Sequence, residues 1–571
     1  MKINICASFP GTALVLSLSL GLTPQPASAE ALIADKIFTS NYVLTMASNG
    51  PGKARPMAIA VNGERISWVG DISQAAARTG PQTELIEFGD NAILPGFIDA
   101  HGHVSFSSLA SNLANVASPP VGPVNNIADL QNTLRAYLAE REIPKGEWIV
   151  GMGYDDSLIA EKRHPDRDDL DAVSTDHPIL LIHVSGHLIA TNSAGLARGG
   201  YSAESINPPG GIIRRRKNSA EPNGVLEETA TGRLRQYMSA PDTDPLGSIE
   251  RTLQDYASYG ITTAQDGAAS AEVIRLLQAA AAAGKLPLDV VAYPLGQSDP
   301  EVVATTYTWG EYDKRLKIAG IKLILDGSPQ GKTAYLSKPY HVHPPGQDAD
   351  YAGYPTITPL ETNRLVGAYL SKQIPIIAHA NGDAAADMLI DAVARARPQH
   401  DHRTVMIHAQ TVREDQLTRM KTLAMIPSFF SAHTFYWGDW HRDSVLGEER
   451  ASRISPTAST QQRGMVFTVH NDAPIVPPDM LRLLWATTNR QTRSGQILGP
   501  EQRISTYEAL RAMTIYAAYQ QFDENDKGSI EVGKLADLVV LSADPLSVDA
   551  TELLDLSVKA TFARGAEVYR R

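Results

Sequence analysis

The segment Leu94-Pro95-Gly96-Phe97-Ile98-Asp99-Ala100-His101-Gly102-His103 decides how this chain folds. It is a short apolar run that ends in polar residues, a pattern typical of a buried strand followed by a loop that carries function. Residues i and i+2 of a strand point to the same side, so the imidazoles of His101 and His103 can face one point. A lone His-x-His pair is a weak signal, because strand histidines are more often hydrogen-bonded core or rim residues. The rest of the chain must therefore supply further ligands.

The same pattern returns along the middle of the chain. The first run spans 93–100, and further apolar runs occupy 261–265, 288–293, 321–325, 375–378, 404–407, 425–430 and 465–469. Helices are expected at 271–283, 359–372, 383–396, 413–421 and 506–519. Eight strand–helix repeats favour a closed (β/α)8 barrel over 93–526. A doubly wound open sheet is the alternative, but no run is followed by the usual glycine-rich dinucleotide turn.

Both ends of the chain differ from the middle in how apolar and polar residues alternate. Residues 36–46 and 58–70 alternate apolar and polar side chains around Asn-Gly pairs, and residues 528–568 show similar strand patterns. We expect one small β-sandwich built from both termini, residues 30–92 and 527–571. About 150 residues separate the first and second runs. A connection of that length predicts a large insertion after the first barrel strand, at about 104–258, that covers the barrel mouth.

Composition limits the partners. The chain has 571 residues, and 51 basic against 63 acidic side chains give a formal charge of −12. Such a surface repels polyanions, so a small-molecule substrate is expected and nucleic acid is not. The only cysteine is Cys6, so a metal must be bound by His, Asp, Glu or Lys. The composition leaves the oligomeric state open, with a homo-oligomer among the alternatives.

Residues 1–29 predict a signal peptide. Lys2 precedes an apolar stretch at 11–22, and Ala27-Ser28-Ala29 offers small residues for cleavage before Glu30. Cleavage would also remove Cys6, which suits an oxidising compartment. We therefore expect a secreted or periplasmic mature protein. No later stretch reaches the roughly 20 apolar residues that a membrane-spanning helix needs.

Several polar residues end the other runs. His379 ends the fifth run, His408 ends the sixth and Asp472 follows the eighth. Catalytic groups of barrels come from the carboxyl ends of several strands, and imidazoles with a carboxylate suit zinc and similar divalent ions. Lys322 lies inside the fourth run, where burying an ammonium is costly. It either pairs with Asp326 or, beside two cations, adds carbon dioxide and becomes a bridging carbamate.

With these motifs in place, the chain resembles the amidohydrolase superfamily, most of all the family 3 branch that includes N-substituted formamide deformylases. The resemblance covers essentially the whole mature chain. It rests on six segments: 95–103, 322–328 (Lys-Leu-Ile-Leu-Asp-Gly-Ser), 379–383 (His-Ala-Asn-Gly-Asp), His408, 472–474 (Asp-Ala-Pro) and 528–537. Two departures are Asn471, where many relatives have serine, and Gly382, where adenosine deaminases place a glutamate. The second departure argues against purine deamination.

The resemblance implies a (β/α)8 barrel, a terminal β-sandwich and a one- or two-metal site, most simply of zinc. His101, His103 and Asp472 would hold the first metal, His379 and His408 the second, and a carboxylated Lys322 would bridge them. Asp472 would then act as general base and acid for an attacking metal-activated hydroxide. Asp99 and Asp326 could orient these ligands or bind backbone instead.

Other histidines are candidates for weaker roles. His187 matches a family position near the pocket and His433 follows the seventh run, so both are expected near the substrate; Tyr436 and Trp437 could cap the mouth. His183 is as well explained by a turn, and His470 is expected to point away from the barrel lumen, as a core residue. The remaining histidines lie in polar stretches and are expected at the surface: His164, His177, His341, His343, His400, His402 and His441.

These features predict a secreted metal-dependent amidohydrolase that cleaves a non-peptide C–N bond in an amide, an N-substituted formamide or a cyclic amide. A periplasmic binding protein is one alternative, although it would need two similar lobes. A hydrolase-like scaffold that has lost its metals is another, against which the intact ligand set weighs.

Overall fold

The structure is a computed structural model that describes residues 32–47, 52–238 and 242–571. The predicted signal peptide at 1–29 lies outside these residues. Within them, four sheets are present: one of eight strands, one of six and two of five. No helix in the described ranges has the length and apolar character that a membrane crossing requires.

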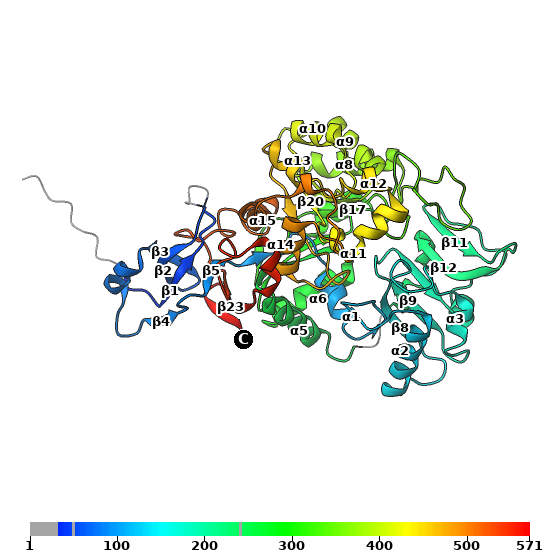
Figure 1. The fold of residues 1–571 in the computed structure, drawn as a ribbon, viewed down its shortest axis with the longest axis horizontal. Coiled ribbons are helices and arrows are strands. Elements are labelled where there is room, and N and C mark those ends of the chain that lie inside the picture. The colour runs from blue at the N-terminus through cyan, green and yellow to red at the C-terminus, as the bar shows by residue number, and fades with distance from the viewer. Residues whose placement is uncertain (1–31, 48–51, 239–241) are drawn as a thin grey trace, which may run out of the picture.

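Strands from both ends of the chain share the eight-stranded sheet, which lies at one end of the molecule (Figure 1). Its hydrogen-bonded order is β24-β23-β22-β5-β1-β2-β3, and β4 pairs with β1. Gly63-Glu64 forms the turn between β2 and β3, where Asn62 pairs with Arg65 and Gly63 has a φ of 58° that suits glycine. The strands are β1 (Lys36–Val43), β2 (Arg55–Asn62), β3 (Arg65–Gly70), β4 (Glu84–Glu87), β5 (Ala92–Pro95), β22 (Leu538–Leu541), β23 (Val558–Ala563) and β24 (Ala566–Arg570).

All eight predicted runs in the middle of the chain contain parallel strands. They are β6 (Phe97–Ile98), β13 (Ile261–Ala269), β14 (Asp289–Pro294), β17 (Ile321–Ile324), β18 (Ile376–Ala380), β19 (Val405–His408), β20 (Ile426–Phe429) and β21 (Thr468–Val469). The first run is divided, because Pro95 ends β5 of the terminal sheet and β6 begins at Phe97. Gly96 is required between them, since a Cβ there would lie 2.3 Å from the Thr262 side chain.

These strands belong to two five-stranded sheets and not to one continuous ladder. One sheet contains β6, β13, β14, β15 (Tyr312–Asp313) and β16 (Leu316–Ile318), and the other runs from β17 to β21. A parallel bridge from Leu295 to Lys322 joins the sheets on one side. On the other side, the Asp472 amide donates to His101 O over 3.0 Å and the His103 amide to Ala473 O over 2.8 Å. The α/β class is confirmed, and the strand ends are brought together at both junctions.

Helices alternate with the strands, as the sequence predicts. The helices over the middle of the chain are α5 (Pro245–Ser258), α6 (Ala271–Ala282), α7 (Pro300–Thr306), α8 (Pro359–Ser371), α9 (Asp383–Ala396), α10 (Glu414–Thr422), α11 (His433–Trp440), α12 (Glu448–Ala451), α13 (Thr457–Gln462), α14 (Met480–Asn489), α15 (Thr506–Ala512) and α16 (Ile515–Gln520). Side-chain caps start several of them: Ser270 accepts from the Val273 amide and Thr358 from the Glu361 amide. The helix expected at 506–519 is interrupted near Thr514, whose φ of −131° and ψ of −94° are not helical.

The segment between β6 and β13 forms a sheet of its own, at the opposite end of the molecule from the terminal sheet (Figure 1). Its order is β11-β12-β10-β9-β8-β7. Its elements are α1 (Val104–Ala110), β7 (Ala114–Asn115), α2 (Ile127–Glu140), β8 (Ile149–Tyr154), α3 (Arg167–Asp171), β9 (Ile179–His183), β10 (Leu188–Thr191), α4 (Ser193–Arg198), β11 (Gly211–Arg215) and β12 (Pro222–Glu228).

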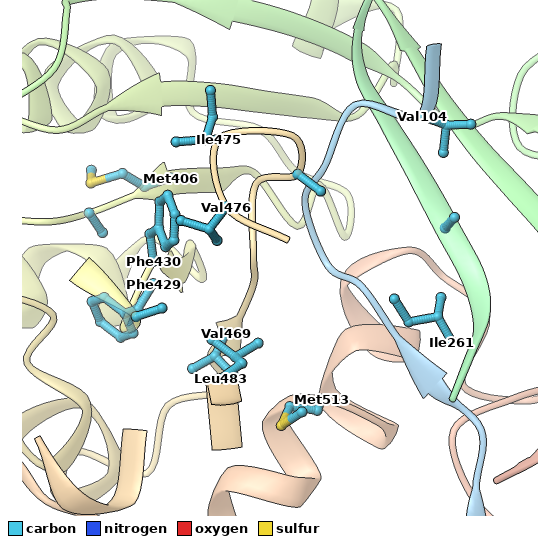
Figure 2. Close-up of a cluster of buried hydrophobic side chains, with 14 of the residues drawn as sticks. Val104, Ile261, Met406, Phe429, Phe430, Val469, Ile475, Val476, Leu483 and Met513 are labelled. Carbon is cyan, nitrogen blue, oxygen red and sulfur yellow. The ribbon is translucent and has the colours of Figure 1, made fainter. Parts of the chain in front are cut away.

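One large apolar cluster connects the parallel strands with their helices. Figure 2 shows part of it, including Val104, Met406, Phe430 and Val476, whose side chains are at most 1% exposed. Burying such side chains supplies roughly 25 cal/mol per Å² of apolar surface, the main favourable term in folding. This core holds the strand ends rigidly, which is what a site assembled from several strands requires.

Candidate metal centre

Three side chains that are far apart in sequence converge where β6 and β21 end. His103 Nε2 lies 3.0 Å from Asp472 Oδ1, and His101 Nε2 lies 3.7 Å from the same oxygen. The ligand atoms of His101, His103 and Asp472 all fall within 4.8 Å of one another. His101 is fully buried, while the His103 and Asp472 side chains are 19% and 11% exposed, so the cluster is reached from one side only through these two residues.

The contacts of Asp472 fit a cation better than a hydrogen bond. Its Oδ1 atom is buried and has no hydrogen-bond partner of acceptable geometry, although His103 Nε2 is only 3.0 Å away. A buried carboxylate oxygen without a partner is costly. Nitrogen and oxygen lone pairs that face one point without bonding to each other can share a divalent cation. The residues present therefore fit a metal ion.

A second pair of imidazoles lies beside the first group. His408 Nε2 is 3.0 Å from His379 Nδ1, and the His101 and His408 ring centroids are 5.7 Å apart. Burial lowers the pKa of His101, His379 and His408 well below that of a free imidazole. These rings are therefore neutral near pH 7, which is the form that binds metal ions.

Hydrogen bonds orient the ring nitrogens that face away from the centre. His101 Nδ1 lies 2.6 Å from Gln265 Oε1, and His379 Nε2 lies 3.0 Å from Gly327 O. His408 Nδ1 lies 3.2 Å from His470 Nε2. Protons on these outward nitrogens leave a lone pair on every inward nitrogen. This is the arrangement by which protein groups around a metal site fix the tautomer of a ligating histidine.

His470 and Gln265 are contributors that sequence reasoning missed. His470 is fully buried, as expected of a core residue. The expectation that it points away from the lumen was wrong, because β21 ends at Val469 and strand alternation no longer applies at residue 470. Its Nδ1 bonds Ser428 Oγ over 2.8 Å, which leaves Nε2 to accept from His408. Gln265 is the polar residue at the end of the predicted run 261–265, and this position could have identified it.

Replacing His470 by Phe should weaken metal binding without unfolding the protein. Phe keeps the ring volume but removes the acceptor of the His408 Nδ1 proton, and loss of such an orienting partner costs about 10–100-fold in metal affinity. Titration of metal-free protein with zinc against a competing chelator measures the change. The control is His402→Phe, because His402 is also buried but bonds Thr404 and the Leu423 carbonyl. Equal affinities in the two variants would show that His470 orients nothing.

Lys322 is positioned among the ligands and away from Asp326. It is 2% exposed, and its Nζ lies 2.9 Å from His101 Nε2. Burial lowers the pKa of Lys322 to about 7, so a neutral amine is accessible at physiological pH. The Asp326 carboxylate is occupied by backbone amides of Tyr335, Asn381 and Gly382, at 2.8 to 3.0 Å.

Asp99 and Asp326, the two carboxylates predicted to orient the metal ligands, accept hydrogen bonds from backbone amides. Asp326 fixes the turn after His379, as described above, and Asp99 accepts from the Asn471 amide over 3.3 Å, next to Asp472. Burial raises the pKa of Asp99 and of Asp326 to about 7. His408 and Asp472 themselves have φ values of 71° and 60°, in the left-handed region that few non-glycine residues adopt. Strain of this kind persists only where the surroundings enforce it, as at functional sites.

His187 approaches the centre from the insertion. Its ring centroid is 4.8 Å from that of His379, and its Nδ1 lies 2.8 Å from Glu228 Oε2. Burial disfavours the charged ring, but the Glu228 carboxylate outweighs this and raises the pKa of His187. Glu228 has an unusual backbone, with φ 49° and ψ −120°, and no sequence signal marks it. The predicted position of His187 beside the centre agrees with this geometry.

A cavity of about 270 Å³ lies between the insertion and the loops after β20 and β21. Its lining includes Ala110, Val184, Trp437 and Ile475, with Arg493 at the edge. Tyr436 lines it as well, as a cap of the mouth would. His433 is not among the lining residues: it is 2% exposed and stacks on His441, with 2.9 Å between their nitrogens.

Three of the histidines that were expected at the surface are covered by other parts of the chain. His402 and His441 are buried, and the His164 side chain is only 9% exposed. Each lies in a polar stretch of sequence, but packing in the folded chain covers it. His183, the suggested turn residue, is fully buried at the end of β9 and pairs with Asp156.

Comparisons with known proteins agree with this geometry. A family model described as "Amidohydrolase family" matches residues 84–569. The N-substituted formamide deformylase of Arthrobacter pascens is 28% identical over 90% of this chain and 95% of its own length. A solved metal-dependent hydrolase of Pyrococcus horikoshii superposes with a TM-score of 0.69 at 22% identity, covering 90% of this chain and 99% of that chain. The zinc complex of atrazine chlorohydrolase from Arthrobacter aurescens has a TM-score of 0.52 at 13% identity, covering 93% and 94%. At these identities the two structures show likeness of fold alone.

Proposed function

We propose that this chain cleaves an amide, an N-substituted formamide or a cyclic amide. The chain belongs to the amidohydrolase family and is a metal-dependent hydrolase of carbon–nitrogen bonds other than peptide bonds. The observation that carries the proposal is the convergence of His101, His103 and Asp472 with the His379–His408 pair. In this proposal the two parallel sheets are the halves of one (β/α)8 barrel, and the ligands occupy the carboxyl ends of its strands.

The ligands divide into two groups. His101, His103 and Asp472 would hold one cation, and His379 and His408 a second. Lys322 would bridge them as a carbamate, formed when its neutral amine adds to carbon dioxide and releases a proton. Imidazole and carboxylate donors suit zinc, which is present in the similar chlorohydrolase structure.

The reaction follows from the residues around this centre. Bound divalent cations lower the pKa of a water molecule and polarise a carbonyl. Asp472 takes a proton from the attacking water and delivers it to the leaving nitrogen as the C–N bond breaks, giving a carboxylic acid and an amine. The Glu228 carboxylate raises the pKa of His187, which favours a ring protonated on both nitrogens. Nδ1 then donates to Glu228, and Nε2 can donate to the carbonyl oxygen as negative charge develops there.

The apolar cavity supports a substrate with an apolar substituent next to the scissile bond. The ligands and the cavity wall are close in sequence: Ile475 follows Asp472 by three residues, and α1 begins directly after His103 and ends at Ala110. Side chains that surround a ligand in such a cavity set which substituents fit.

Filling this cavity should change the substrate specificity without changing the catalytic step. Ala110→Trp is expected to lower kcat/KM for amides with bulky apolar substituents by about 10–200-fold, the range for one pocket contact, and to change little for small amides. Steady-state kinetics with both substrate types measure this. Ala282→Trp is the control, since Ala282 is exposed at the end of α6. An equal loss on both substrate types would mean that the cavity does not bind the substituent.

A hydrolysis screen tests the proposed activity. Mature protein loaded with zinc is incubated with N-formyl and N-acyl amines, and release of amine is followed with and without a chelator. Metal-dependent turnover is the expected result. Tight binding of these compounds without turnover would instead indicate a binding protein, and neither binding nor metal uptake would indicate a scaffold that has lost its site.

We also propose that the protein is exported. The support is the leader pattern at 1–29, with small residues before Glu30. Amino-terminal sequencing of the protein from its host should begin at Glu30.

A further inference from the structure

A second group of metal-ligand side chains lies inside the insertion. Asp156 follows β8, His183 ends the neighbouring parallel strand β9, and His164 returns on the loop between β8 and α3. His183 Nε2 lies 3.0 Å from Asp156 Oδ1, and His164 Nε2 lies 3.6 Å from Asp156 Oδ2. One ligand atom of each residue falls within 4.8 Å of the other two. None of the three belongs to the centre described above.

The spacing of these atoms suits a small divalent cation. A zinc ion with bonds of about 2.0–2.1 Å separates tetrahedral ligand atoms by about 3.3 Å. The two measured separations lie on either side of that value. The two histidines approach opposite oxygens of one carboxylate, so small side-chain movements would bring all three donors onto one ion. A fourth position would be left for water.

Both outward ring nitrogens are already paired with hydroxyl groups. His164 Nδ1 lies 3.3 Å from the Tyr154 hydroxyl, and His183 Nδ1 lies 2.8 Å from Ser185 Oγ. The Ser185 amide also donates to His183 Nδ1 over 3.2 Å, which places the ring proton on Nε2 while no cation is bound. Binding of a cation would move that proton to Nδ1, where the Ser185 hydroxyl can accept it. Both Nε2 atoms do point at Asp156.

The charge of Asp156 is only partly compensated, because Arg214 lies near enough to lower the pKa of Asp156 without forming an ion pair with it. Among the described residues, no lysine or arginine forms an ion pair with it, and its side chain is 13% exposed. Nearby Arg214 is bound to Glu227, and Lys332 donates to Val342 O and Ser444 Oγ. The adjacent Asp155 shows the contrast, because Ser157 and the Trp437 indole satisfy both of its oxygens. A largely buried carboxylate that contacts imidazoles directly, with Arg214 and Lys332 nearby but bound elsewhere, would be stabilised by a cation bound to it.

We propose that Asp156, His164 and His183 bind a divalent cation of the zinc class within the insertion. The ion is structural: it fastens the loop between β8 and α3 to the end of β9. Asp155, on the same loop, lines the apolar cavity and holds Trp437. The ion therefore fixes one wall of the cavity. This holds whatever substrate is cleaved at the strand-end centre, the site formed by His101, His103, Lys322, His379, His408 and Asp472.

Metal analysis separates this site from the strand-end centre. Protein is saturated with zinc, freed of excess by gel filtration and measured by mass spectrometry of the metal. His164→Ala should contain one equivalent less than the wild type, while His402→Ala, a buried histidine outside both groups, should keep the wild-type content. Equal content in all three proteins would overturn the proposal, and the Asp156 contacts would then be hydrogen bonds only, in which His183 Nε2 donates to the carboxylate.

A second variant keeps the test decisive if His164→Ala does not fold. His103→Ala, Asp472→Asn double-mutant protein lacks two ligands of the strand-end centre but retains Asp156, His164 and His183. Substituted with cobalt, it should show the absorption of a tetrahedral N/O site, and adding His164→Gln should remove the share of one bound cobalt, whatever the His379–His408 pair retains. Cobalt content and absorption that are unchanged by His164→Gln would contradict the assignment. Neither result depends on turnover, so failure of the proposed hydrolase function would leave this test intact.

Discussion

Asp472→Asn should remove nearly all hydrolytic activity while leaving the fold intact. Asparagine matches the shape of aspartate but cannot accept the proton of the attacking water. Loss of a general base costs about 10²–10⁴-fold in rate. Asp472 Oδ1 also lies 3.0 Å from His103 Nε2, so the amide should weaken metal binding as well.

The measurement is therefore kcat at saturating zinc, with the metal content determined in parallel. The matched control is Asp544→Asn, because Asp544 is likewise buried but holds the Leu546 amide and the Ser547 hydroxyl, remote from the centre. Asp472→Asn protein that retains metal but is inert supports the assigned role. A kcat close to that of the wild type would exclude Asp472 as the base.

Lys322→Met should lose bound metal and most activity. Met keeps the apolar stem of the lysine in its buried position but has no amine to form a carbamate. Loss of a bridging ligand should cost at least the roughly 10–100-fold seen when a partner of a metal ligand is removed. Metal content should fall by about one ion per chain.

Lys322→Glu distinguishes a lost ligand from lost packing. Its carboxylate can replace the carbamate in part, so this variant should retain more metal than Lys322→Met. In wild-type protein, labelled bicarbonate should produce a carbamate signal by ¹³C NMR that is absent from both variants. Full metal content and rate in Lys322→Met would show that the lysine bridges nothing.

Much of the architecture is predictable from the sequence, because buried parallel strands are continuous apolar runs. The run at 321–325 corresponds to β17 at Ile321–Ile324, and the predicted helix at 383–396 matches α9. His101, His103 and Asp472 converge as expected, since carboxyl ends of parallel strands meet at one edge.

The remainder depends on contacts that no local pattern records. His470 lies beyond the end of β21, so the alternation of side chains along a strand does not determine the direction of its ring. Glu228 reaches His187 through an unusual backbone conformation at the end of β12. His164 lies in a polar stretch of sequence, and its burial arises from packing against Tyr154 and His183. Pairings of this kind arise only when distant segments fold together.

The most direct test of the metal centre is a crystal structure of zinc-loaded protein with diffraction data on both sides of the zinc absorption edge. We expect an anomalous peak within about 2.0–2.2 Å of the His101, His103 and Asp472 donor atoms. Saturated crystals with no anomalous peak at these residues would contradict this expectation.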